Sequence, residues 1–162
     1  MTHNELAVRI ERAEGPDRAL DAEIMFDLFA KPVGIHPADG GPRGYIWPED
    51  NPSWNFGLRF PSKDRNWFQK QSTREDGERI LIERDGALVL MNDLRIPRLT
   101  ASIDAAMQLV PEGWTGFVAI EAGQETWLWP KDETIGKGFR VGHNVPAMGL
   151  CAAAMLASAL VV

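Results

Sequence analysis

Cysteine is nearly absent from this chain, and its scarcity limits the ways in which the fold can be stabilised. Cys151 is the one cysteine among 162 residues, so no disulfide can form within the chain. The chain also has only three histidines, and it contains no Cys-x-x-Cys or His-x-x-x-His spacing that could hold a structural zinc. The sequence therefore predicts neither a metal site nor a cofactor.

An apolar leader and an excess of positive charge are also missing. The first twenty residues contain Glu5, Glu11 and Glu14 but no apolar run, which favours a cytoplasmic protein over a secreted one. Seventeen Lys and Arg stand against 23 Asp and Glu, for a net charge of −6. Because phosphates would meet a field of like sign, duplex nucleic acid is not an expected partner.

Recognised catalytic motifs are absent as well. No Gly-x-Ser-x-Gly elbow presents a nucleophile, and Gly136-Lys137-Gly138 lacks the spacer and the following helix of a phosphate-binding loop. The sequence gives no positive reason to expect an enzyme.

The composition that is present is typical of a globular protein. With 44% apolar and 25% charged residues, the chain has enough apolar material for one domain spanning residues 1–162. Helical periodicity predicts helices over 4–13, over about 16–28 with Leu20, Ile24 and Leu28 as the buried stripe, and over about 101–110. Thr100 or Ser102 can cap the third of these helices.

Strand patterns are antiparallel in type. Residues 80–91 form two β-prone runs around Asp85-Gly86, which predicts a hairpin with a type I′ turn. A second hairpin is expected from 117–120 and 126–129, followed by a short strand at 139–141. We predict an α+β fold, in which an antiparallel sheet of about five strands packs with about four helices in a layered sandwich.

The segment from Pro146 to Val162 contains no charged residue. A membrane segment and a buried helix both fit this composition. Because the 16 residues after Pro146 fall short of the roughly 20 that span a bilayer, we expect a buried helix and no membrane association. An exposed apolar face of this helix would allow a homodimer.

The region 30–77 has a different composition from the rest of the chain. It contains six Pro, six Gly and half of the aromatic residues, without sustained periodicity. Because exposing Trp47, Trp54 and Trp67 together would leave much apolar area in water, we expect an ordered, irregular insertion that packs on the domain.

This insertion also carries the candidate binding site. Aromatic rings supply stacking faces and arginines bind anions, a combination that suits a nucleotide-like ligand. The alternative is a satellite core in which the arginine stems lie across the rings. The candidate ligand-binding residues are Arg43, Tyr45, Trp47, Trp54, Arg59 and Trp67.

Acidic residues of the second predicted helix suggest a competing hypothesis. Asp17 or Asp21, or His143 before the last helix, would act in a small hydrolase of a phosphate compound. The alternative is structural: the acids complement the helix dipole, Arg18 pairs with Asp21, and His143 is a turn residue or a hydrogen-bond partner. Cys151 is expected to be buried and inert.

Three blocks resemble the phage ABA sandwich domain family, small proteins of phage and prophage genomes named for a layered α/β/α architecture. They are residues 6–24, with Gly-Pro-Asp-Arg followed by Leu-Asp-Ala-Glu-Ile, residues 99–114, with Thr-Ala-Ser-Ile-Asp, and residues 146–156. The last helix departs from the family pattern, because it ends Ser-Ala-Leu-Val-Val without basic residues. The resemblance implies a fold and a phage origin, but no known reaction and no catalytic residues.

We therefore expect a non-catalytic phage or prophage accessory protein in the host cytoplasm. Its partner would be a small molecule, such as a nucleotide-like ligand, or a host protein. The hydrolase and a phage structural or assembly protein are the alternatives.

Overall fold

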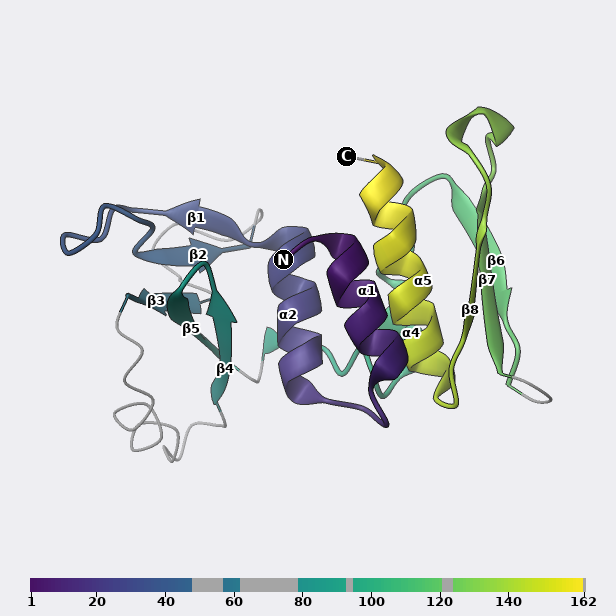
Figure 1. The fold of residues 1–162 in the computed structure, drawn as a ribbon, viewed down its shortest axis with the longest axis horizontal. Coiled ribbons are helices and arrows are strands. Elements are labelled where there is room, and N and C mark those ends of the chain that lie inside the picture. Colours follow the sequence, from purple (N-terminus) through teal and green to yellow (C-terminus); the bar gives the residue numbers. More distant parts are fainter. Residues whose placement is uncertain (48–56, 62–78, 93–94, 121–123, 162) are drawn as a thin grey trace. The chain divides into compact units, whose positions relative to one another are not determined.

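The computed structural model describes residues 1–47, 57–61, 79–92, 95–120 and 124–161. These residues divide into two compact units (Figure 1). The terminal unit contains Met1–Ile24 and Pro97–Val162, and the central unit contains Met25–Ile96. Each unit is described by itself. The expectation of one domain with an insertion stays a prediction.

Helix α5 (Pro146–Val161) forms the core of the terminal unit. It packs against α1 (His3–Arg12) and against a three-stranded sheet, so that residues from Ala147 to Ala157 are almost all buried (Figure 1). The buried-helix prediction is thus confirmed. The large apolar side chains exposed on the described helix are Leu160 and Val161 at its end, and the homodimer stays a prediction. No helix in the described ranges is long and apolar enough to cross a membrane.

Gly149 and Thr126 explain how closely α5 approaches its sheet. A Cβ at position 149 would lie 3.0 Å from the Thr126 hydroxyl, which is itself buried on β7 (Glu125–Pro130). β7 is the middle strand between β6 (Trp114–Val118) and β8 (Phe139–Gly142), and all pairings are antiparallel. The second predicted hairpin and the strand near 139 are therefore confirmed.

Capping residues fix the ends of the other helices. Thr2 and Glu5 form a capping box at the start of α1. α2 (Arg18–Phe29) begins after Asp17, whose side chain accepts a hydrogen bond from the Ala19 N–H. Ser102, rather than Thr100, caps α4 (Ile103–Met107), which is shorter than the predicted helix because residues 108–110 form turns.

The central unit contains a five-stranded antiparallel sheet in the order β1-β2-β3-β5-β4. The predicted hairpin consists of β4 (Arg79–Arg84) and β5 (Ala87–Asn92), joined by Asp85 and Gly86, both at positive φ. This prediction is confirmed. β5 pairs with a strand on each side, and its residues from Ala87 to Met91 are buried.

The described part of the insertion is more regular than the sequence predicts. It forms three short strands, β1 (Lys31–Val33), β2 (Gly44–Ile46) and β3 (Gly57–Phe60). Strands of three or four residues are too short to show alternation. Gly57 also lacks a side chain for a packing reason, since a Cβ there would lie 2.9 Å from the Val89 side chain. The α+β class with antiparallel strands and four described helices is as predicted, with the strands divided between two sheets.

Candidate functional site

Four of the six predicted binding residues are described, and they have different environments in the central unit. Arg43 and Arg59 line the same pocket, whereas Tyr45 and Trp47 contact rings of α2. Trp54 and Trp67 lie outside the described residues.

Tyr45 faces the interior of the unit. Its side chain is buried, with 8% of the residue exposed, and its ring makes an edge contact with Phe26 at 4.5 Å between centroids. Burial raises the pKa of the Tyr45 hydroxyl. Trp47 is partly exposed and its ring lies 6.0 Å from that of Phe29. Tyr45 therefore presents no free stacking face, and its position matches the satellite-core alternative.

Arg59 on β3 holds the loop between β1 and β2 in place. Its guanidinium makes two hydrogen bonds to the Asp39 carboxylate, at 3.1 and 2.6 Å, and one to the Pro42 carbonyl at 3.3 Å. Arg59 holds the pKa of Asp39 at about 2, well below its ordinary value of 3.8. A Cβ on Gly41 would lie 2.8 Å from this guanidinium, so the loop requires glycine there. Arg59 is thus engaged within the protein.

Arg43 lies just before β2, and no described residue pairs with its guanidinium as Asp39 pairs with that of Arg59. Its backbone is fixed on both sides, by its N–H to the Val33 carbonyl and by its carbonyl to the Arg59 N–H. Its side-chain stem runs beside Gly34, where a Cβ would lie 3.2 Å from the Arg43 Cδ, and Gly34 has a φ of +66°. Among the described residues, nothing forms an ion pair or hydrogen bond with the guanidinium.

His36 lies in the same loop and was not among the predicted binding residues. Its Nδ1 accepts a hydrogen bond from the Ala38 N–H at 3.2 Å and lies 3.8 Å from an Asp39 carboxylate oxygen. With Nδ1 as the acceptor, the proton of the neutral ring is on Nε2, which is then a donor. Only its placement in a loop rich in Gly and Pro could have suggested a binding role from the sequence.

A hollow that we call the basic pocket is lined by Val33, Gly34, His36, Arg43, Leu58, Arg59 and Phe60. Its volume is about 520 Å³. Arg43, Arg59 and His36 supply cations or N–H donors, and Val33, Leu58 and Phe60 supply apolar surface. Since Asp39 and Arg59 neutralise each other, Arg43 is the arginine among the described lining residues that is available to a ligand. The pocket suits a small anion with an apolar part.

The residues of the hydrolase hypothesis have structural partners in the terminal unit. Asp21 is buried and bound to Arg18 and Thr100, while Asp17 caps α2. The Arg18–Asp21 pair agrees with the structural alternative. His143 accepts a hydrogen bond from the Val145 N–H at 2.8 Å through Nδ1, and its Nε2 lies 3.0 Å from the Ala13 carbonyl oxygen. It is a hydrogen-bond partner, as the structural alternative expects.

Cys151 is fully buried, and burial raises the pKa of its thiol. Across the described ranges, no three His, Cys, Asp or Glu side chains are grouped closely enough to hold a metal ion. No protein-family model, curated protein or solved structure matches the chain.

Proposed function

We propose that this chain is a non-catalytic phage or prophage accessory protein that binds a small anionic ligand in the basic pocket. One observation carries the binding proposal. The Arg43 guanidinium lines an open hollow without an ion-pair partner among the described residues, although its backbone and stem are held by Val33, Arg59 and Gly34. A cation held in this way is preorganised for an external anion.

The neighbours of Arg43 favour a ligand with two chemically different parts. A phosphate or carboxylate would pair with the Arg43 fork and accept a hydrogen bond from His36 Nε2. An apolar or flat part would cover Leu58, which is 41% exposed, and Val33 beside it. A nucleoside monophosphate has both parts. A single compact anion also suits an acidic chain better than a long polyanion does.

The state of Asp39 supports a binding role rather than a catalytic one. Asp39 is held ionised by Arg59, with a pKa of about 2, so it does not supply a proton near neutral pH. Its oxygens are also occupied by the Arg59 guanidinium and the Gly41 N–H. Asp39 supports the loop rather than a reaction.

Calorimetric titration with the four common nucleoside monophosphates tests this proposal. Arg43→Ala should weaken binding by roughly tenfold or more, because a charge-assisted bidentate contact is lost. Arg98→Ala is the matched control, since it removes one exposed arginine from the terminal unit and leaves the basic pocket intact. Equal weakening by both variants would indicate a general charge effect. No binding by the parent protein would refute the nucleotide class.

A further inference from the structure

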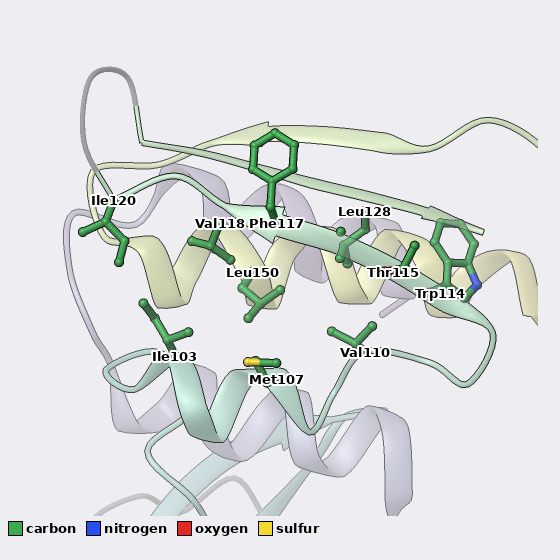
Figure 2. Close-up of a pocket in the computed structure, with 11 residues that line it drawn as sticks. Ile103, Met107, Val110, Trp114, Thr115, Phe117, Val118, Ile120, Leu128 and Leu150 are labelled. Carbon is green, nitrogen blue, oxygen red and sulfur yellow. The ribbon is translucent and has the colours of Figure 1, made fainter. Parts of the chain in front are cut away.

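A second hollow lies in the terminal unit, and we call it the apolar pocket. α4 and the following Val110 form one wall, β6 forms the other, and Leu150 of α5 lies between them (Figure 2). Its volume is about 360 Å³, within the range of small-molecule sites. All of its lining residues belong to this one unit.

The apolar pocket has a buried base and an exposed rim. Leu128 and Leu150 at the base are 3% and 2% exposed. Met107 and Ile120 at the rim are 60% and 65% exposed, although both are large apolar side chains. A molecule seated here would therefore cover rim side chains that water now contacts, and would do so without displacing the core.

The strand register separates this pocket from the opposite face of the sheet. Figure 2 shows the Phe117 ring directed away from Leu150 and Met107. That ring instead stacks with Trp127, its cross-strand partner, at 6.3 Å and meets Trp129 edge-on at 6.2 Å. Because the Phe117 ring points away, the side chains that form the walls are mainly aliphatic, among them Ile103, Val110 and Val118.

The lining determines which ligand chemistry fits. Among the described residues, no charged side chain lines the pocket, and its polar side-chain groups are the Thr115 hydroxyl and the Trp114 indole N–H, which is buried without a hydrogen-bond partner. The segment 103–118, which forms both walls, carries two charged residues, Asp104 and Glu112, and both are acidic. A ligand carboxylate would find no cationic partner among the described lining residues. The geometry points to a small uncharged aliphatic molecule as the occupant, with its chain against Leu150 and any hydroxyl at the rim.

This site is independent of the basic pocket, which belongs to the central unit. A small molecule also fits better than a protein segment. The hollow is bounded on three sides, and its volume is near the lower end of ligand pockets.

Methyl NMR of the full chain with ¹³C-methionine tests the inference with 1-octanol as the probe. The Met107 methyl signal should shift and saturate during the titration. Met91, buried in the central unit, is the internal control and should not move. Octanoate should bind at least fivefold more weakly than octanol because of its charge. Equal shifts at both methionines, or equal affinity for octanoate, would overturn the inference.

Rim variants locate the site. Met107→Gln and Ile120→Gln should each weaken octanol binding by roughly fivefold or more, because part of the apolar contact is lost. Both side chains are exposed, so folding should be retained, as thermal melts by circular dichroism will show. Leu160→Gln is the matched control, an exposed apolar residue outside the pocket, and should leave affinity unchanged. Equal loss in the control, or a Met107 shift that follows dimer formation in sedimentation, would also overturn it.

Discussion

The buried carboxylate of Asp21 accepts two hydrogen bonds from Thr100, one from the backbone N–H and one from the hydroxyl, each of 2.7 Å. The same hydroxyl accepts a hydrogen bond from the Asp17 N–H at 3.1 Å. One threonine therefore joins the start of α2 to the chain before α4. The 1% exposure of Asp21 means that water cannot replace these bonds.

Thr100→Val should destabilise the protein by about 1–3 kcal/mol, because the shape is kept while a buried carboxylate loses a donor. Chemical denaturation measures this loss. Thr100→Ser restores the hydroxyl and should recover most of the stability. If valine and serine variants were equally stable, the hydroxyl would have no role in stability.

The Asp39–Arg59 pair should make the loop between β1 and β2 sensitive to acid. The pKa of Asp39 is about 2 in the folded protein and 3.8 for the free side chain, so the folded state favours the ionised form. The stabilisation from this pair is present in full above about pH 4 and declines as the pH falls from there towards 2.

Carboxyl ¹³C NMR of Asp39 across that range measures the pKa directly. Arg59→Met should move the Asp39 pKa upward towards its ordinary value, since the main cause of the lowering is removed. Glu125, which pairs with Arg140 in the terminal unit, is the control and should titrate as before. An unchanged Asp39 titration in the variant would contradict the pairing.

Gly149 tests how tightly α5 packs on its sheet. Gly149→Val should destabilise the fold by about 1–3 kcal/mol, because the first added carbon already lies 3.0 Å from the Thr126 hydroxyl. Gly15→Ala is the comparison, since nothing lies within 4 Å of a Cβ at that position. Thermal unfolding should show a large loss for the first variant and little change for the second.

Gly86 tests the turn between β4 and β5. Its φ of +75° is unfavourable for residues with a side chain, so Gly86→Val should destabilise the hairpin by about 1–2 kcal/mol. Asp85→Asn should be nearly neutral, because asparagine tolerates the φ of 51° at that position. Hydrogen exchange of the β4 and β5 amides would report both effects. Equal protection in the two variants would argue against a conformational requirement for glycine.

The elements that the sequence predicts best are those with strong local signals. Asp85-Gly86 between two apolar runs indicates a hairpin by itself, and the charge-free run after Pro146 indicates a buried helix. β1, β2 and β3 have no such signal, because each is short and is stabilised by its neighbours. The division of the strands between two sheets depends on long-range pairing, which no local pattern encodes.

The candidate site was predictable only where local sequence signals point to it. Arginines near aromatic residues drew attention to Arg43 and Arg59, and both line the basic pocket. Their different roles depend on Asp39, which reaches Arg59 across 20 residues of sequence. The burial of Tyr45 likewise depends on Phe26 of α2, which lies outside the insertion. Composition predicts which residue types are present in the insertion, but only the folded contacts distinguish Arg43, which has no ion-pair partner among the described residues, from Arg59, which supports a loop.

The thiol of Cys151 is buried in the terminal unit, where it donates a hydrogen bond to the Leu99 carbonyl. Its rate of alkylation would therefore report how often the terminal unit opens. An alkylating reagent would find this sulfur only during excursions in which α5 loosens from its surroundings. The labelling rate would then measure the local opening of α5 in the unmodified protein, because each molecule carries a single thiol.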